Sequence, residues 1–202
     1  MSTLRLILGD QLNHDISSLK DANKSEDVIL FCELFNEATY VKHHKKKLAF
    51  IFSTMRHFAD TLLQDGWHVD YVKLNDETNT HSFSSEVARA ITRHNSDTLV
   101  VTLPSEWRVS EEMQEWSSVL NCAVELREDT RFYYQLDEFA TWAKGRKQLR
   151  MEFFYRELRR STGILMDGEE PVGGKWNYDI ENRVSPPNDL KIPSPSTFAP
   201  DV

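Results

Sequence analysis

Side chains that could bind a small molecule gather at the ends of three apolar segments of the chain. They are carboxylates, amides and aromatic rings, which suit the hydroxyl groups of a polyol and the N–H and C=O groups of a heteroaromatic ring. The candidates are Gly9, Asp10 and Gln11 after the first segment, Glu33, Asn36, Glu37 and Tyr40 after the second, and Pro104, Glu106, Trp107 and Arg108 after the fourth. A glycine lets the backbone approach a ligand closely, while Asp10 is equally suited to capping the turn that follows it.

Motifs for phosphate binding and for nucleophilic catalysis are absent from these positions. Neither G-x-x-x-x-G-K-[ST] nor G-x-G-x-x-G follows the first apolar segment, so we do not expect a phosphate-binding loop of either common type. No G-x-S-x-G elbow is found, and Ser105 beside Glu106 is a weak candidate for a hydrolase nucleophile. We therefore expect a binding site and assign no catalytic residue.

The histidines and cysteines do not form a metal-binding pattern. His43, His44 and His57 fall in one predicted helix, where His43 and His44 point in different directions and no carboxylate completes the usual spacing. Cys32 and Cys122 each end a strand-like run, and we interpret both as buried thiols in a reducing compartment. Two cysteines alone supply neither a structural zinc site nor an iron–sulfur cluster.

Two basic regions each allow two interpretations. The run KHHKKK at residues 42–47 places cations in the first turns of a predicted helix, although helix starts normally favour acids; the simpler interpretation is a solvated end. The segment KGRKQLRMEFFYRELRR at residues 144–160 mixes cations with aromatic rings, as nucleic-acid or domain-docking surfaces do. Salt bridges to Glu152 and Glu157 within that helix would explain part of the second pattern equally well.

The candidate residues are positioned by an alternation of strands and helices. Five short runs rich in Val, Ile, Leu and Tyr cover residues 4–8, 28–32, 69–73, 98–103 and 123–126. Most are nearly continuous apolar runs, as is typical of parallel strands buried on both faces. Between them lie a long helical pattern over residues 40–65, which Gly66 ends, and two shorter ones that we expect Ser84 and Ser110 to cap. The alternation predicts an α/β, Rossmann-like, doubly wound sheet of five parallel strands, with ligands beyond the carboxyl ends of the strands.

The pattern changes after Leu126, where we expect two helices, at residues 137–143 and 151–160, and no further strand. Gly163 is placed to end the second helix. From Gly168 onward prolines and serines crowd too closely for regular structure. We predict an α/β domain at residues 1–130, a helical extension at 131–167 and an extended connector at 168–202, and we expect the chain to be a piece of a longer protein.

The bulk composition limits the classes of function. The chain has 202 residues, of which 40% are hydrophobic, enough for a large core. Its formal charge of −8 argues against coating nucleic acid by itself, because that affinity comes from cations. No window approaches the roughly 20 apolar residues of a membrane span, and no signal peptide opens the chain. We expect a cytoplasmic monomer without a membrane segment.

Several long blocks of the sequence are similar to one protein family. LILGDQL, EATYVKHHKKKLAFIFSTMRHFA, EWRV, GRKQLRMEFFYRE and PVGGKWNYDIENR occur in the order found in the amino-terminal region of the iron–sulfur bacterial cryptochromes and photolyases. This group is also called the deoxyribodipyrimidine photolyase-related proteins. The resemblance extends over residues 6–200. It implies an antenna domain that binds 6,7-dimethyl-8-ribityllumazine, joined to a helical domain with FAD and a [4Fe–4S] cluster that repairs (6-4) photoproducts in damaged DNA.

The resemblance also implies roles for particular residues. Arg183, in the matching ENR of the connector, is expected to contact DNA or the missing FAD domain. The rival hypothesis is a nucleotide- or protein-binding module of the same fold without photochemistry. The resemblance assigns the lumazine pocket to Gly9, Asp10, Gln11, Glu37, Tyr40, His43 and Ile51, with Glu33 and Trp107 as weaker candidates.

Overall fold

The chain folds into two compact units. The structure, a computed structural model, describes residues 2–179 and 181–199. The first unit is Met1–Gln135 and the second is Leu136–Val202. The candidate residues at the strand ends all belong to the first unit, whereas Arg183 belongs to the second. Neither unit bound coincides with the predicted domain limits at residues 130 and 167, which stay predictions.

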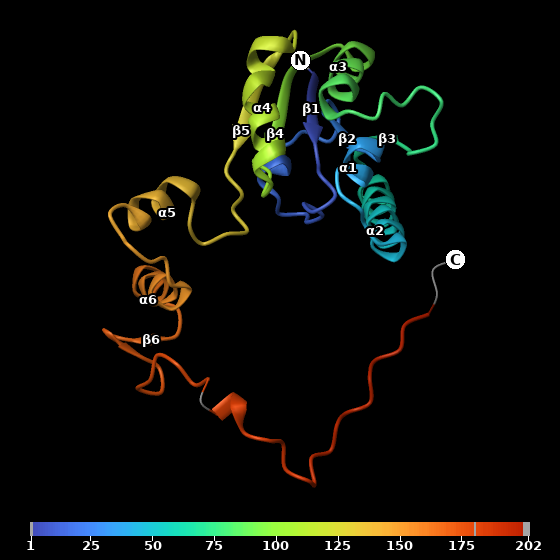
Figure 1. Cartoon of the computed structure of the whole chain (residues 1–202). Helices are drawn as coiled ribbons and strands as arrows, with labels where there is room; N and C mark the ends of the chain where they lie inside the picture. The colour runs from blue at the N-terminus through green and yellow to red at the C-terminus, as the bar shows by residue number, and fades with distance from the viewer. Residues whose placement is uncertain (1, 180, 200–202) are drawn as a thin grey trace. The chain divides into compact units, whose positions relative to one another are not determined.

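The first unit is built on a sheet of five parallel strands (Figure 1). The strands are β1 (Ser2–Leu6), β2 (Val28–Cys32), β3 (His68–Val72), β4 (Ser96–Thr102) and β5 (Ala123–Arg127). Their order across the sheet is β3-β2-β1-β4-β5, so β1 lies at the centre between β2 and β4. All five predicted strands are confirmed, and with them the predicted α/β, Rossmann-like class. The near-continuous apolar runs arise because both faces of the sheet are covered.

Alternate strand residues form two separate hydrophobic cores, one on each face of the sheet. In β1, Leu4 and Leu6 belong to one core, and Ile7, just past the strand, belongs to the other. The first core is completed by α3 (Phe83–His94) and α4 (Trp107–Val119), and the second by α2 (Lys45–Gln64) and the short 3-10 helix η1 (Ser17–Leu19). The helices thus cover both faces, as the doubly wound topology requires.

The long helix begins later than the sequence pattern predicted. A short helix, α1 (Phe35–Thr39), ends at Tyr40, and α2 begins only at Lys45. His44 is the reason, because its backbone is extended and its side chain accepts a hydrogen bond from the Lys46 N–H as the N-cap of α2. The prediction of one helix from Tyr40 was therefore wrong at its start. His43 and His44 precede the helix instead of lying on it.

The two shorter helices also begin at other residues than predicted. Ser82, not Ser84, caps α3, since its side chain accepts from the Ser85 N–H. In α4 the N-cap is Glu106, and Ser110 lies buried inside the helix. Because Ser84 and Ser110 lie within a turn of the true helix starts, their polar side chains resembled caps in sequence. Ser84 instead accepts a hydrogen bond from the ring of Trp116.

The second unit contains two helices and a very short hairpin. Helices α5 (Leu136–Ala143) and α6 (Met151–Thr162) match the predicted ones, and Gly163 ends α6 in a left-handed conformation with φ 70°. Strands β6 (Met166–Asp167) and β7 (Glu170–Pro171) pair antiparallel, so the expectation of no further strand was wrong. Two-residue strands leave no periodicity to detect. One 3-10 turn, η2 (Glu181–Arg183), follows.

Candidate ligand site at the carboxyl edge of the sheet

The carboxyl ends of the five parallel strands meet at one edge, and this edge holds the candidate residues. The chain leaves β1 toward β2 and β3 on one side, then returns to place β4 and β5 on the other. The winding therefore reverses between β1 and β4, the position at which open α/β sheets bind ligands. We call the loops that follow β1, β2, β4 and β5 at this edge the rim.

Gln11 fixes the first loop of the rim and is fully buried, with 0% of its surface exposed. Its Nε2 donates to the carbonyl oxygens of Thr102 and Leu103 at the end of β4, at 3.1 and 3.3 Å. Its Oε1 accepts from the Leu8 N–H at 3.3 Å. A buried amide satisfied in this way ties the β1 loop to β4. The polar atoms of this side chain are therefore used within the protein, where they hold the β1 loop in place.

Gly9 and Ile51 are brought into contact across the same loop. A Cβ at position 9 would lie 3.3 Å from Ile51 Cγ2 and 3.0 Å from Met55 Sδ. The absence of a side chain at Gly9 thus lets the loop lie directly against α2 at Ile51 and Met55. Ile51 is half-buried and packs against the core on this face. Two residues that the resemblance assigned to one pocket therefore adjoin.

Glu33 is a fully buried carboxylate held by four donor groups. Arg56 donates through Nε and Nη2 at 2.6 and 2.8 Å, the Tyr71 hydroxyl at 2.7 Å and the Leu74 N–H at 2.9 Å. Burial by itself raises the pKa of Glu33, but the hydrogen bonds from Arg56, Leu74 and Tyr71 outweigh it and hold that pKa below its ordinary value. Glu33 therefore joins β2, α2 and β3 beneath the rim.

Replacing Glu33 with glutamine should remove an acid-sensitive part of the stability. The folded-state pKa is depressed, so its contribution is full above the ordinary carboxyl pKa and is lost as pH falls through the folded value. We expect Glu33→Gln to cost about 2 kcal/mol at pH 7, the scale of hydrogen bonds to a charged group. Urea unfolding at pH 7 and pH 3 measures this. A difference that stays constant between the two pH values would contradict the assignment.

Arg108 gathers three of the predicted site residues into one cluster on the rim. Its Nη1 and Nη2 donate to the carboxylate of Glu37 at 3.0 and 2.6 Å, and its guanidinium lies 4.6 Å from the ring centre of Tyr40. The Tyr40 ring in turn meets His43 edge-on, with ring centres 5.4 Å apart. The hydrogen bond to Glu37 raises the pKa of Arg108, so the guanidinium stays charged. This cluster joins the loop after β2 to the start of α4.

Two further candidates lie at the rim with their side chains in solvent. Asp10 is exposed, and its carbonyl oxygen accepts a hydrogen bond from Arg131 Nη1 at 2.6 Å. Arg131 is itself paired with the buried Asp129, so the segment after β5 reaches back to the β1 loop. Trp107 is 73% exposed at the first position of α4. An exposed carboxylate and an exposed indole ring are thus free to meet a ligand.

The sequence analysis counted Arg108 among the candidates but gave it no place in the lumazine pocket, and it did not single out Arg131, although both residues connect the loops of the site. Arg108 stood among the residues after the fourth strand, and its charge beside Glu106 gave no sign that it pairs with Glu37, 71 positions away. Arg131 lies in a region that the sequence pattern assigned to a helical extension. Arg183 is exposed in η2 of the second unit, and its predicted contact with DNA or another domain stays a prediction.

Neither cysteine belongs to the rim cluster. Cys32 is buried at the end of β2 as predicted, and burial is the main cause that raises the pKa of its thiol far above the ordinary range. Cys122 is only partly buried, so the prediction of two buried thiols was right for one of them. Within residues 2–179 and 181–199, no three His, Cys, Asp or Glu side chains meet as metal ligands, and no helix is long and apolar enough to cross a membrane.

The chain matches known proteins over nearly its whole length. Residues 5–202 match the family described as deoxyribodipyrimidine photo-lyase-related protein. A (6-4) photolyase of Agrobacterium fabrum is 51% identical over 201 residues, which are 100% of this chain and 40% of that protein. An uncharacterised protein of Acanthamoeba polyphaga mimivirus is 27% identical over 200 residues, 95% of this chain and 99% of that protein. The chain therefore spans two fifths of the photolyase.

Proposed function

Because the chain belongs to the deoxyribodipyrimidine photo-lyase-related family, as its amino-terminal part, we propose that it is the antenna domain of a light-driven DNA-repair flavoprotein or cryptochrome. The pigment would be 6,7-dimethyl-8-ribityllumazine, bound at the rim. In our proposal FAD and a [4Fe–4S] cluster belong to the rest of a longer protein, which would act on (6-4) photoproducts. The match covers 40% of the (6-4) photolyase, which supports the assignment of pigment binding and repair to different parts of a longer protein.

The observation that supports pigment binding most strongly is that accessible carboxylates and flat aromatic rings occur together at the rim. A ribityl chain carries hydroxyl donors, for which the exposed carboxylate of Asp10 is a suitable acceptor; the partly exposed carboxylate of Glu37 can accept as well, beside its hydrogen bonds from Arg108. A heteroaromatic ring needs flat or apolar neighbours, and Tyr40, Trp107 and Ile51 offer them. The exposed groups of the rim therefore fit a polyol attached to a flat ring.

The buried residues of the rim have a different part in this proposal. Gln11 and Glu33 use their polar atoms within the protein, and we assign them to holding the loops in place. Gly9 lets the β1 loop lie against α2, and His43 supports the Tyr40 ring. When bound, the pigment would supply excitation energy to FAD, and the protein's own contribution is to keep its position and orientation fixed.

A bulky replacement at Ile51 tests the pigment site. Titration of the chain with 6,7-dimethyl-8-ribityllumazine, followed by fluorescence polarisation, measures binding. Ile51→Trp should weaken binding on the order of 100-fold, because an indole cannot fit beside Gly9 without displacing the loop or the ligand. Leu63→Trp, at a position of the same helix that is 51% exposed, is the matched control and should bind like the unaltered chain.

The outcomes of this titration separate the two hypotheses. Equal affinity in the Ile51→Trp and Leu63→Trp variants would remove Ile51 from the site. A folded chain that binds no lumazine at millimolar concentration would refute the pigment proposal and favour the nucleotide- or protein-binding module. Circular dichroism of each variant shows whether the fold is kept.

A further inference from the structure

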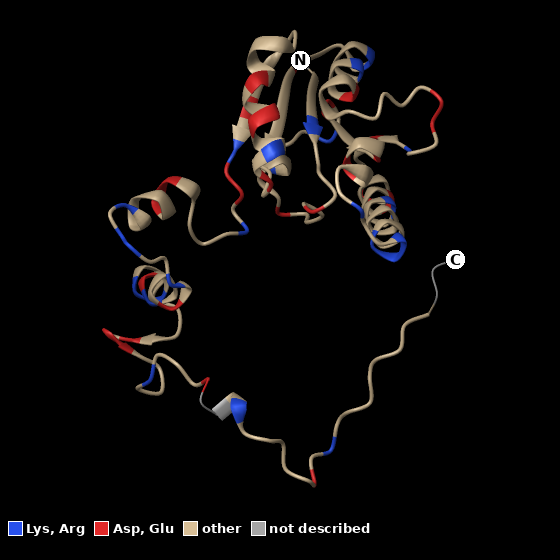
Figure 2. Ribbon diagram, viewed as in Figure 1, with Lys and Arg blue, Asp and Glu red and all other residues tan. Residues whose placement is uncertain are grey.

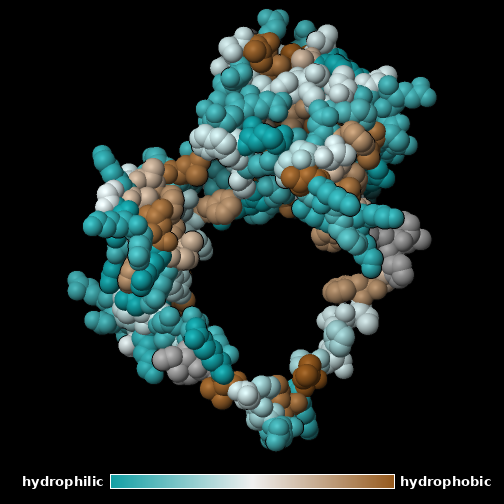
Figure 3. All heavy atoms as spheres, viewed as in Figure 1, coloured by the Kyte–Doolittle hydropathy of each residue, from teal (hydrophilic) through white to brown (hydrophobic). Residues whose placement is uncertain are grey.

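The turn before α2 and the first positions of that helix form a concentrated basic surface. Six consecutive residues, 42–47, are lysine or histidine, and all four lysines are exposed. We call Lys42, Lys45, Lys46 and Lys47 the lysine patch. Figure 2 shows its blue colour at the lower end of α2, and in the space-filling view of Figure 3 the surface there is hydrophilic. The whole chain has 24 lysines and arginines against 32 acidic residues, so four lysines and no acidic residue within six positions are a strong local excess of positive charge.

The contacts among the described residues do not account for the concentration of charge in the lysine patch. Among the described residues, none of these four lysines forms an ion pair with a carboxylate; Lys47 Nζ lies 3.4 Å from His43 Nδ1. The first turn of α2 has no acidic residue, whereas α3 and α6 have Glu86 and Glu152 there. Cations at the positive end of a helix dipole are unfavourable. The patch therefore lowers the stability of the chain unless an external anion neutralises it.

The apolar face of α2 indicates which kind of anion can reach the patch. Met55, Ala59 and Leu62 on that face are buried against the sheet, so the helix has no free apolar stripe to insert into a lipid surface. What remains exposed at this end of α2 are the four flexible ammonium groups, together with the rings of Tyr40 and Phe50, which flank the patch in the sequence. Lysines of this kind contact phosphates as point charges and carry no base specificity.

We propose that the lysine patch binds the sugar–phosphate backbone of duplex DNA. This inference rests on the proposed function, because the substrate of a photolyase-like protein is DNA. It adds a DNA contact from the antenna unit itself, next to Tyr40 and His43 at the rim. The patch would bind the duplex by charge alone, and it would therefore bind DNA of any sequence, damaged or undamaged.

Salt-dependent binding to an undamaged, fluorescein-labelled duplex tests the proposal. Anisotropy titrations of the 202-residue chain between 20 and 200 mM salt give the slope of log K against log salt. Four phosphate contacts predict a slope of about −3.6, from about 0.9 per contact. Replacing all four lysines of the patch with glutamine should bring the slope close to zero. At 50 mM salt the affinity should fall on the order of 100-fold.

A matched variant removes the same charge elsewhere. Lys20, Lys73, Lys144 and Lys147 are also exposed lysines, and changing all four to glutamine should alter the affinity by less than about 3-fold. An equal loss in both variants, or no measurable binding by the unaltered chain at 20 mM salt, would overturn the proposal. A larger loss in the control would also overturn the proposal, and it would place the DNA contact at one or more of the four control lysines.

Lumazine titration of the same samples keeps this proposal separate from the proposed function. DNA binding that depends on the lysine patch in a chain that binds no pigment would refute only the antenna function. Pigment binding without patch-dependent DNA binding would refute only the lysine patch.

Discussion

Replacing Asp27 with leucine is expected to lower the free energy of unfolding by about 3–5 kcal/mol, because it leaves a buried arginine without its counter-ion. Arg5 in β1 and Asp27 before β2 form an ion pair of 2.7 Å, and both side chains are almost completely buried. Asp27 also accepts from the Asn23 N–H at 2.9 Å. The replacement thus removes one charge and leaves two donors unsatisfied.

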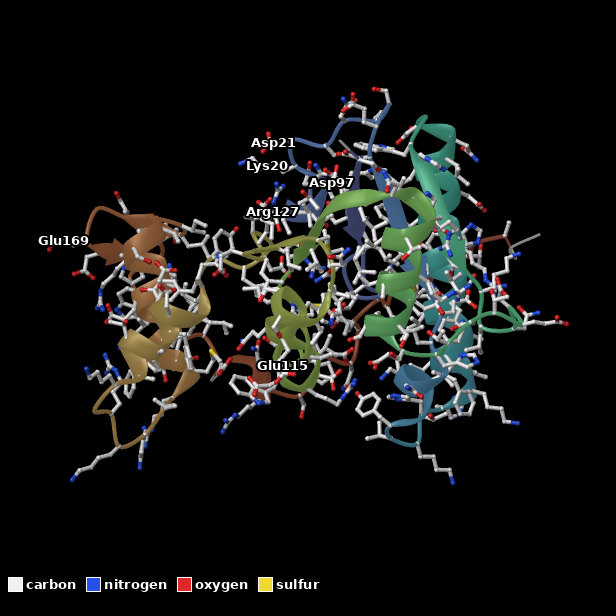
Figure 4. The ribbon with its side chains drawn as sticks, turned by 90° about the horizontal axis from the view of Figure 1, so that it is seen from above. Lys20, Asp21, Asp97, Glu115, Arg127 and Glu169 are labelled. Carbon is white, nitrogen blue, oxygen red and sulfur yellow. The ribbon has the colours of Figure 1, made fainter. Side chains whose placement is uncertain are left out.

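Arg5 also binds the loop around η1, so the loss of Asp27 is expected to disturb that loop as well. Its Nη1 donates to the carbonyl oxygen of Ser18 at 2.6 Å, and Arg127 donates to those of Ser17 and Lys20 at 2.8 and 2.7 Å. In Figure 4, Arg127 lies close to Lys20, in agreement with that hydrogen bond. The two guanidinium groups hold the loop around η1 against the sheet.

Urea unfolding of two further variants completes the test of the Arg5–Asp27 pair. The double change Arg5→Met with Asp27→Leu should recover a large part of the loss, because no uncompensated charge remains. Glu157→Gln, which removes an exposed partner of Arg160, should cost less than about 1 kcal/mol. If Asp27→Leu cost no more than Glu157→Gln, the pair would contribute little in spite of its burial.

Truncating Trp116 to alanine should cost about 3–5 kcal/mol, the range for large aromatic side chains deleted from a core. Trp116 is 0% exposed and is among the largest fully buried side chains. Its Nε1 donates to Ser84 Oγ at 2.8 Å, and Ser84 Oγ lies 2.5 Å from Glu112 Oε1. The indole therefore both fills the core between α3 and α4 and joins the two helices.

Trp107 provides a matched control on the same helix. It is 73% exposed, so Trp107→Ala should change the free energy of unfolding by less than about 0.5 kcal/mol. The same variant should nevertheless weaken lumazine binding if its ring flanks the pigment. Thermal and urea unfolding measure the two variants side by side. Similar losses for Trp116→Ala and Trp107→Ala would mean that the core around α4 is not packed as described.

The sheet was predictable mainly because its central strands β1, β2 and β4 are largely buried, whereas the edge strands β3 and β5 are partly exposed. The continuous apolar runs of β2 and β4 leave no alternation that could suggest a half-exposed strand, and helical patterns separate them. The break between α1 and α2 was not predictable in the same way. Residues 42–47 contain only lysine and histidine, and the start of α2 is marked by the extended backbone at His44, a residue that is not a common cap.

The location of the candidate site was predictable from the sequence, but the hydrogen bonds and ion pairs within it were not. Topology alone brings the residues after β1, β2 and β4 to one edge of the sheet. Whether a polar side chain there faces inward or outward depends on partners distant in sequence. Gln11 turns inward because two carbonyl groups at the end of β4 accept from it, and Glu37 pairs with Arg108 across the rim. One sequence contains no signal for such pairs.

The connections of the β1 loop also determine when the rim can form during folding. Gln11 reaches the carbonyl of Thr102, 91 positions later, and the Asp10 carbonyl is held by Arg131, 121 positions later. Contacts of such long range are costly to form from the unfolded chain, because closing a long loop costs entropy before the contact repays it. A nascent chain can therefore complete the contacts of the β1 loop only after Arg131 has been made, when almost all of the first unit has been synthesised.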